Sequence, residues 1–379
     1  MRKVVSHLFH VAQFGTFDVE SMGDSLFPAA LDFGIGKNDS AEITLFSLKS
    51  GKAPFITEVQ VHSFEEFDEL QSEKKFDLVV LGGGEFLHFE EINFTVDGVK
   101  KVYPEGYIWK NALQLAQKYK IPSVLNCVGV GRDLFPYQEQ QLREYLGTAA
   151  CISVRDPFSA ERMNRAGIKN AECVADNLWY LNRMYSKQQL DTHRNELQLS
   201  TGICFSEPYI IVQYGTTKNT KELARQLLQI QNCTGYLIYL MPMNYCHEDR
   251  IALEMVQAAA GEKVRLLDPD FYPVDMLSII SGSRFFIGTS LHGNLTAASY
   301  NVPFVGLDMY PSFVSKMDGI FSMLECEKYL VPDVCALYSA FVSRWKDSEC
   351  TDMVNEKISE FQITLDRHFQ RISEIMRGE

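Results

Sequence analysis

The sequence lacks the cysteine pairs that build disulfide frameworks and zinc sites. It has nine cysteines, and no two of them form a Cys-x-x-Cys pair. They stand at positions 127, 151, 173, 204, 233, 246, 326, 335 and 350. An odd number of singly placed cysteines argues against both a disulfide framework and a zinc centre. We therefore predict reduced, buried thiols and no bound metal.

The sequence also lacks long hydrophobic runs and an excess of basic residues. No stretch reaches the ~18 apolar residues that a membrane-spanning helix needs, and His7, His10 and Gln13 interrupt the apolar run at the amino terminus. We expect a cytoplasmic protein with at most peripheral contact at the inner face of a membrane. The 36 Lys and Arg against 49 Asp and Glu give a net charge of −13. This argues against general nucleic-acid binding and leaves room for a local site for a small anion.

The glycine-rich signatures of nucleotide binding are incomplete. The run LGGGEFL at residues 81–87 has Leu87 where G-x-G-x-x-G requires its third glycine, and CVGVGRDL has Leu134 at the equivalent position. Neither run carries the lysine of a P-loop. We therefore expect no NAD, no P-loop nucleotide and no other cofactor. Both runs follow predicted strands, where glycines either form a tight turn or let a ligand or another backbone segment come close.

Short β-branched apolar runs alternate with longer helical patterns, which is typical of parallel α/β sheets. With 46% hydrophobic residues among 379, the chain is globular and long enough for two domains. The predicted strands cover residues 43–48, 78–81, 123–128, 151–154, 173–175, 209–214, 236–241, 264–267, 285–288 and 304–307. The predicted helices cover residues 23–33, 106–119, 157–166, 219–231, 247–260, 273–281 and 291–300. We predict two doubly wound α/β domains facing a cleft, with the ligand at the carboxyl ends of the strands.

The alternation fails between residues 184 and 208, where the chain is polar and has no clear period, so we interpret this stretch as a linker. The resulting parts are a first domain at residues 1–185, a linker at 186–208, a second domain at 209–330 and a C-terminal helical segment at 331–379. In the last part, apolar side chains recur every three or four residues from Val354 to Met376, which predicts a long amphipathic helix. We expect this helix to brace the first domain.

The run RFFIGTSLHGNLTAASYNVPFVGLD, residues 284–308, reads as a strand, a short turn, a helix and a second strand. The turn and the start of the helix contain Thr289, Ser290, Leu291, His292 and Gly293. Free amides and the helix dipole favour an anion at such a place, and the two hydroxyls add donors. A histidine side chain has a reference pKa of about 6.5, so His292 is a candidate phosphate ligand or proton donor. The alternative for His292 is a capping or packing role.

Further polar residues stand at predicted strand ends. Arg155, in ISVRD, offers two parallel donors to a carboxylate or phosphate, unless Asp156 or Glu161 holds it in an ion pair. Asp156 is itself a candidate helix cap. In MPMNYCHED, His247 and Asp249 are candidate ligands of sugar hydroxyls and equally candidate caps.

The loop FGTFDVESMGDSLF near the amino terminus carries the carboxylates Asp18, Glu20 and Asp24. Carboxylates in such loops commonly bind sugar hydroxyls, and Asp24 is also a good helix cap. The candidate ligands of sugar hydroxyls, which form the predicted binding site for a sugar that accepts a transferred group, are Asp18, Glu20, Asp24, Glu85, His247 and Asp249.

Six runs in this order resemble the polysaccharide pyruvyl transferase family. They are GTFDVESMGDSLFPAAL, LVVLGGGEFL, SVLNCVGVG, ISVRDPFSAERMNRAGI with VADNLWYL, LMPMNYCHEDR, and FIGTSLHGNLTAASYNVPFVGL. The resemblance extends from about residue 10 to about residue 320. It implies two Rossmann-like domains similar to those of B-type glycosyltransferases. It also implies transfer of the pyruvyl group of phosphoenolpyruvate to a sugar of a surface polysaccharide or its lipid-linked precursor, with release of phosphate.

The resemblance further implies roles for individual residues. It places Arg155 where the family binds the anionic groups of the donor, and His292 where the family contacts donor phosphate or supplies the general acid. Ketal formation needs a proton on the methylene carbon of phosphoenolpyruvate, attack by sugar hydroxyls on the adjacent carbon and departure of phosphate. Asp24 or Asp249 is then the base for a hydroxyl. Phosphoenolpyruvate is a co-substrate in this scheme, and no metal is required.

One position departs from the family. Many members have an arginine directly before the Leu-His pair, and here that position holds Ser290. A fixed positive charge is therefore missing unless Arg132 or Arg284 supplies it. Two other functions fit the same fold: a nucleotide-sugar-dependent glycosyltransferase, and a noncatalytic carbohydrate-binding or assembly protein.

Overall fold

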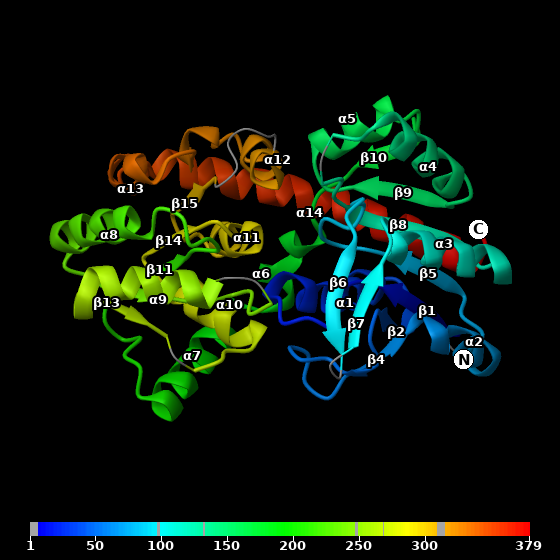
Figure 1. The fold of residues 1–379 in the computed structure, drawn as a ribbon, viewed down its shortest axis with the longest axis horizontal. Helices are drawn as coiled ribbons and strands as arrows, with labels where there is room; N and C mark the ends of the chain where they lie inside the picture. Colours follow the sequence, from blue (N-terminus) through cyan, green and yellow to red (C-terminus); the bar gives the residue numbers. More distant parts are fainter. Residues whose placement is uncertain (1–6, 97–98, 132, 247–248, 268, 309–314) are drawn as a thin grey trace, which may run out of the picture. The chain divides into compact units, whose positions relative to one another are not determined.

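The computed structural model describes residues 7–96, 99–131, 133–246, 249–267, 269–308 and 315–379, with the backbone alone at 93–96 and 99–100. The chain divides into two compact units (Figure 1). Unit 1 comprises Met1–Val19, Asp24–Asn177 and Phe361–Glu379, and unit 2 comprises Glu20–Gly23 and Leu178–Glu360. Each unit has its own parallel sheet and its own hydrophobic core.

The main sheet of unit 1 has the strand order β10-β9-β8-β5-β1-β2-β4-β3, and its neighbours are parallel except for the antiparallel pair β3 and β4. Its strands are β1 (Leu8–Phe14), β2 (Ser40–Ser47), β3 (Gly51–Lys52), β4 (Gln60–Ser63), β5 (Leu78–Leu81), β8 (Ser123–Val128), β9 (Cys151–Val154) and β10 (Ala171–Cys173). A separate antiparallel hairpin consists of β6 (Ile92–Val96) and β7 (Val99–Tyr103). The helices are α1 (Met22–Ile35, the first two residues in unit 2), α2 (Phe67–Lys74), α3 (Tyr107–Tyr119), α4 (Pro136–Leu146) and α5 (Pro157–Arg165).

The sheet of unit 2 has the strand order β13-β12-β11-β14-β15-β16, and its neighbouring strands are parallel. Its strands are β11 (Tyr209–Gln213), β12 (Leu237–Leu240), β13 (Val264–Leu266), β14 (Phe285–Gly288), β15 (Phe304–Leu307) and β16 (Leu330–Val331). Its helices are α6 (Leu181–Met184), α7 (Lys187–Thr201), α8 (Thr220–Thr234), α9 (Asp249–Ala260), α10 (Pro273–Gly282), α11 (Leu291–Ser299), α12 (Lys316–Met323) and α13 (Leu337–Trp345). Helix α14 (Ser348–Arg377) begins in unit 2 and ends in unit 1.

The predicted alternation of strands and helices is confirmed. Strands β5, β8, β9, β14 and β15 have the predicted bounds, and the predicted helices around α3, α5, α8, α9, α10 and α11 differ by a few residues at their ends. These strands are fully buried, as expected for parallel sheets covered on both faces. The last predicted strand of the first half is shifted, because β10 ends at Cys173, where the prediction began.

The interrupted apolar run at the amino terminus forms β1, which lies between β2 and β5 in the sheet. Two polar residues, His10 and Gln13, lie in the interior of this strand. The backbone amide of His10 donates to Asp77 Oδ2 at 2.8 Å, and its imidazole Nδ1 lies 3.5 Å from Glu42 Oε2. The side-chain amide of Gln13 donates to the carbonyl of Gly82 at 3.2 Å, which offsets part of the cost of burying it.

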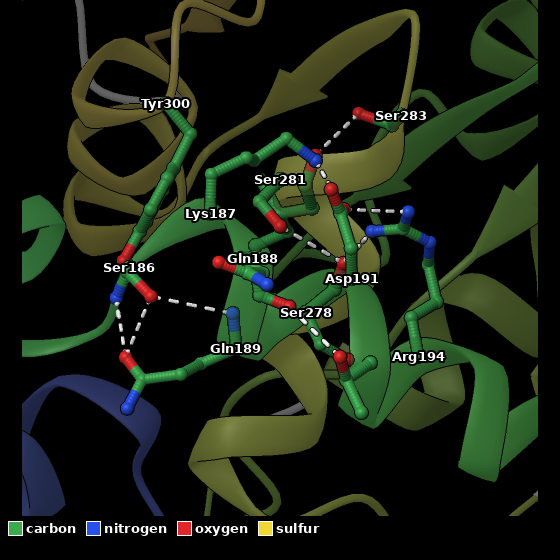
Figure 2. A network of polar contacts seen from close by, with 12 residues as sticks. Ser186, Lys187, Gln188, Gln189, Asp191, Arg194, Ser278, Ser281, Ser283 and Tyr300 are labelled. Carbon is green, nitrogen blue, oxygen red and sulfur yellow. Dashed lines mark hydrogen bonds and ion pairs between the residues drawn. The ribbon is translucent and has the colours of Figure 1, made fainter.

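The prediction of a linker at residues 186–208 is wrong, because most of this stretch forms helix α7. Ser186 and Gln189 form a capping box, with the Ser186 amide donating to Gln189 Oε1 at 2.8 Å and the Gln189 amide donating to Ser186 Oγ at 3.3 Å. Arg194 ties the helix to α10 because it donates to the carbonyl of Ser278 at 3.0 Å, and within α7 it donates to Asp191 at 2.7 Å (Figure 2).

Helix α7 is therefore part of unit 2, which begins at Leu178. Within α7, Leu190 is the one residue classed as buried. A helix held mainly through polar contacts shows little hydrophobic period, so the sequence pattern did not reveal it.

The predicted amphipathic helix near the carboxyl terminus is confirmed as α14. Its apolar stripe is buried at Val354, Ile358, Phe361, Leu365, Phe369, Ile372 and Met376. The part from Phe361 onward belongs to unit 1, where Phe369 packs against α1 at Gly34. A Cβ atom at Gly34 would lie 2.5 Å from the Phe369 ring, so the glycine makes the close helix contact possible.

All nine cysteines are free thiols. The expectation that they are buried holds for Cys127, Cys151, Cys326 and Cys350 and is wrong for the others, of which Cys173, Cys233, Cys246 and Cys335 are exposed. In the part of the chain that the structure describes, no helix combines the length and the apolar character needed to span a membrane.

A buried histidine ties α14 to the sheet of unit 1. The Nε2 atom of His368 lies 3.0 Å from Asn126 Oδ1 on β8 and 3.2 Å from Ser153 Oγ on β9. Burial, and to a smaller extent the positive charge of Arg371, lowers the pKa of His368 from 6.5 to about 4. The imidazole is therefore neutral at neutral pH, because a second proton, on Nδ1, would place a positive charge in a buried position.

We expect acid to weaken unit 1 through this histidine. In the unfolded chain His368 binds a proton below a pH of about 6.5, whereas in the folded chain it does so only near pH 4, so the stability it contributes is lost as the pH falls through this window. Between pH 7.5 and 4.5 the loss from this single group is about 2 to 3 kcal/mol of unfolding free energy. Urea unfolding of the wild type and His368→Gln over this pH range should show a smaller loss in the variant. Exposed His7→Gln is the matched control, and equal losses in wild type and His368→Gln would contradict the assignment.

Candidate functional site

The carboxyl ends of three neighbouring strands of unit 1 bring together the glycine runs and the SVRD run. Strand β5 leads into Gly82–Gly84, β8 into Gly129–Gly131, and β9 into Arg155. The two glycine loops are joined by backbone hydrogen bonds, from the Gly129 amide to the Gly84 carbonyl at 2.7 Å and from the Leu87 amide to the Gly129 carbonyl at 3.1 Å. Such loops at the carboxyl edge of a parallel sheet are the usual place for a binding site.

The glycines of these loops make room for two of the protein's own charged side chains. A Cβ atom at Gly129 would lie 2.7 Å from the Arg155 guanidinium, and one at Gly131 would lie 2.5 Å from Glu85 Oε1. Gly84 faces Asp24, whose Oδ1 would be 3.4 Å from its Cβ position. Both sequence-based explanations apply. Gly82 and Gly84 have φ of 111° and 76°, as a tight turn requires, and at Gly129 and Gly131 the group that comes close is a side chain of the protein itself.

Arg155 is buried among carboxylates. Its side chain is 2% exposed, and its nitrogens lie 3.6 Å from Asp156, 3.7 Å from Glu85 and 3.7 Å from Asp176. Asp156 also caps α5, as predicted, by accepting hydrogen bonds from the amide and hydroxyl of Ser159 at 2.8 and 3.0 Å. A guanidinium in this setting compensates buried carboxylates. Among these carboxylates, Glu85 is the one with a partly exposed side chain, at 35%.

The predicted trio Asp18, Glu20 and Asp24 is divided between the two units. Asp18 belongs to unit 1 and accepts a hydrogen bond from the Lys49 amide at 3.1 Å, and burial raises its pKa. Asp24 is half-buried in unit 1, in the first turn of α1. Glu20 is exposed and belongs to unit 2.

The segment Glu20–Gly23 is bound to the loop after β12 in unit 2. The Met22 amide donates to the carbonyl of Met243 at 3.1 Å, and the Tyr245 amide donates to the carbonyl of Glu20 at 2.9 Å. Ser21 and Asn244 form an antiparallel bridge between these bonds. Residues 20–23, from the loop before α1, thus belong to unit 2.

This pairing brings Gly23 against His292. A Cβ atom at Gly23 would lie 1.8 Å from His292 Nδ1. Since real side chains cannot approach so closely, a glycine is required for the imidazole to occupy this position. His292 is half-buried, in the first turn of α11.

Ser290 and Thr289 are engaged in fixing the start of α11. Ser290 is the N-cap, and its hydroxyl oxygen accepts from the Gly293 amide at 3.2 Å. The Thr289 hydroxyl donates to Gln213 Oε1 at 3.1 Å and accepts from the Gly215 amide at 3.0 Å. Because Thr289 is used in this way, the predicted role of its hydroxyl as an anion donor is replaced by a role in positioning the turn.

Gln213 is a residue that the sequence reasoning missed. Its Oε1 accepts from Thr289 and from the Ser290 amide, the latter at 2.8 Å, and its Nε2 donates to Asp249 Oδ2 at 2.9 Å. The signal that marks it is its place as the last residue of the buried strand β11, two residues before Gly215.

Asp249 was predicted to bind the acceptor or act as a base, and the structure corrects both roles. The residue is 2% exposed, and the same oxygen that accepts from Gln213 also accepts from the amides of Met243 and Asn244, both at 3.1 Å. A buried carboxylate occupied in this way orders the loop after β12. The other residue of this corner, His247, lies outside the described residues.

Arg132 and Arg284 are the two residues expected to replace the family arginine. Arg284 is exposed and precedes β14, whereas Ser290 follows it, so the length of the strand, ~13 Å, separates them. Arg284 therefore does not replace the missing charge. Arg132 lies outside the described residues.

Removing the Arg155 charge should leave its buried carboxylates uncompensated. We expect Arg155→Met to lower the free energy of unfolding by about 3 kcal/mol or more. Arg165→Met, which removes an arginine paired with exposed Asp133, should cost less than about 1 kcal/mol. Urea unfolding at neutral pH measures both values, and similar losses in the two variants would show that Arg155 is not a required countercharge.

A methyl group at position 23 should displace His292. In Gly23→Ala we expect the imidazole signals of His292 to shift in nitrogen-detected NMR spectra, because the added Cβ overlaps the ring. The signals are assigned by their absence in His292→Gln. Gly147→Ala is the control, since its Cβ would meet only the Arg143 carbonyl at 3.2 Å. Unchanged His292 signals in Gly23→Ala would contradict the proposed contact.

Comparison with known proteins identifies fold and family. Solved structures similar over nearly the whole chain include a UDP-GlcNAc 2-epimerase from Neisseria meningitidis bound to UDP-GlcNAc (10% identity, 98% of this chain and 100% of that chain, TM-score 0.62). A sucrose-phosphate synthase from Thermosynechococcus elongatus matches equally well (10% identity, 98% and 100%, TM-score 0.62). Anabaena HepE in complex with UDP-glucose also matches (12% identity, 98% and 99%, TM-score 0.58). These likenesses confirm the predicted α/β fold class of B-type glycosyltransferases and related epimerases.

No curated protein matches the chain. The family model for polysaccharide pyruvyl transferase matches residues 22–309, from the start of α1 to just beyond β15. This range contains Gly23, Glu85, Arg155 and His292. This match covers well over half of the chain, and the chain therefore belongs to the polysaccharide pyruvyl transferase family of transferases.

Proposed function

We propose that the protein transfers the pyruvyl group of phosphoenolpyruvate to a sugar of a surface polysaccharide or its lipid-linked precursor, and that phosphate is released. The observation that carries this proposal is the seating of His292 against Gly23 at the start of α11, within the range matched by the family. An imidazole beside a helix amino terminus combines a proton donor with a site that favours phosphate.

The donor phosphate is assigned to the amino terminus of α11. The first-turn amides of a helix and its dipole attract an anion without a fixed positive side chain. Ser290 occupies the position of the family arginine and caps the helix through the Gly293 amide. In this chain the helix terminus thus takes over phosphate binding that an arginine supports elsewhere in the family.

The chemistry assigned to His292 is delivery of a proton to the methylene carbon of phosphoenolpyruvate. As that carbon becomes a methyl group, the oxygen of one sugar hydroxyl bonds to the adjacent carbon. The bond from this carbon to the phosphate oxygen then breaks, and the oxygen of a second hydroxyl forms the ketal. Of the two hydroxyl protons, one replaces the proton given by His292 and the other leaves with phosphate, so the reaction balances.

In unit 1, Glu85 and Asp24 are assigned to the acceptor. Glu85 is partly exposed and its carboxylate is held 3.7 Å from the Arg155 guanidinium, while Asp24 lies beside the Gly84 loop. Carboxylates accept hydrogen bonds from sugar hydroxyls, and an ionised one removes a hydroxyl proton. Because Arg155 is buried, its assigned role is to position Glu85 rather than to contact the donor directly.

A donor screen tests the proposal. Purified protein with a lipid-linked saccharide acceptor should release phosphate from phosphoenolpyruvate, and His292→Gln should lower kcat/KM by about 100-fold or more, since a positioned general acid contributes that much. His7→Gln, a change at an exposed histidine, should leave the rate unchanged. Nucleotide release from a nucleotide sugar, without phosphate release from phosphoenolpyruvate, would establish the glycosyltransferase alternative instead. Saccharide binding without turnover of any donor would establish a noncatalytic role.

A further inference from the structure

A groove of about 180 Å³ lies in unit 1 at the carboxyl ends of β2 and β4. The two strands are parallel and in register at their last residues, Ser47 and Ser63, so the segments that follow them meet at one edge of the sheet. The far wall comes from β7 and the start of α3. Glu85 follows β5, whose carboxyl end lies at this same edge.

Three aromatic rings line the groove. Tyr103 and Tyr107 have ring centroids 4.7 Å apart with an interplanar angle of 59°, and Phe64 meets Tyr107 edge-on at 5.9 Å. Both tyrosines are half-buried. Aromatic faces carry partial negative charge, so they attract the C–H groups on the face of a sugar ring.

Charged groups of both signs lie at the groove. Among the described residues, Lys49, Lys101 and Glu65 line it. Asp18 lies beside it through its hydrogen bond with the Lys49 amide, and Glu66 through its hydrogen bonds with Ser50 and Ser63. Burial raises the pKa of Tyr103, and the charges of Glu65 and Asp18 raise it further, which keeps its hydroxyl neutral. With two lysines and three carboxylates among the described residues, no strong positive field exists that would favour an anion, so the groove suits an uncharged polar ligand. Donors and acceptors side by side suit hydroxyl groups, which both donate and accept.

We infer that this groove binds an uncharged sugar residue of the acceptor other than the one that is modified. The inference rests on the proposed function for the identity of the acceptor. In the sheet, β1 separates β2 from β5, so the groove begins about 10 Å from the strand that leads to Glu85. That span exceeds one sugar ring. The acceptor recognised by the protein is therefore an oligosaccharide.

Saccharide binding without any donor tests the groove directly. The probes are lactose, cellobiose, mannobiose and chitobiose with their constituent monosaccharides, and binding is followed by saturation-transfer NMR on the full chain. At least one disaccharide should bind more tightly than its monosaccharides. Tyr103→Ala should weaken this binding by about tenfold through loss of the stacking ring, and Tyr103→Phe should retain it. Tyr137→Ala, at an exposed tyrosine on α4, is the matched control.

The charge of the ligand is tested by Lys101→Gln and by competition with inorganic diphosphate. An uncharged sugar loses no more than about twofold in Lys101→Gln and is not displaced by diphosphate. Displacement by diphosphate, absence of binding by every probe, or equal binding in Tyr103→Ala would each overturn the inference. The His292→Gln variant separates the two proposals, because it should lose transfer and keep saccharide binding. Binding that depends on Tyr103 in a protein that does not use phosphoenolpyruvate would leave the groove standing and reject the pyruvyl transfer.

Discussion

The loops of unit 1 depend on one buried positive charge. Arg155 is 2% exposed and meets carboxylates that follow β5, begin α5 and follow β10. Removing a guanidinium from water is unfavourable unless carboxylates surround it, and the buried carboxylates are equally unfavourable without the guanidinium. Three chain segments are therefore held by the same ion, and Gly129 is required because the guanidinium takes the space of its side chain. Glu85 is positioned as a consequence, with its carboxylate partly in solvent.

In unit 2 a buried carboxylate is paired with an uncharged side chain instead of an arginine. The buried carboxylate of Asp249 and the start of α11 are joined through Gln213, which donates to the carboxylate and accepts from the turn that opens the helix. Gln213 thus couples the position of Asp249 to the start of α11, where the proposed donor phosphate binds.

The sequence predicted features that depend on local pattern. Buried strands such as β5 and β14 are continuous apolar runs, and Asp156 caps α5 because it directly precedes Pro157. Features set by distant contacts were not predictable. A polar surface hid the period of α7, and the burial of Asp249 depends on partners from another strand and from the loop after β12. The need for glycine at position 23 comes from His292, far along the chain, so the local sequence did not indicate it.

The net charge of −13 and the assignment of an anionic donor are consistent because of distance. At physiological salt an exposed charge is screened within about 8 Å, so a small anion responds to the groups that line its own site. A long polyanion spans many such lengths and meets the whole acidic surface, which disfavours it. For the proposed acceptor, lysines and carboxylates lie side by side near Tyr103, so selection there would depend on shape and hydrogen bonding more than on net charge. The proposed substrates, an uncharged saccharide and a small anionic donor, are consistent with this charge distribution.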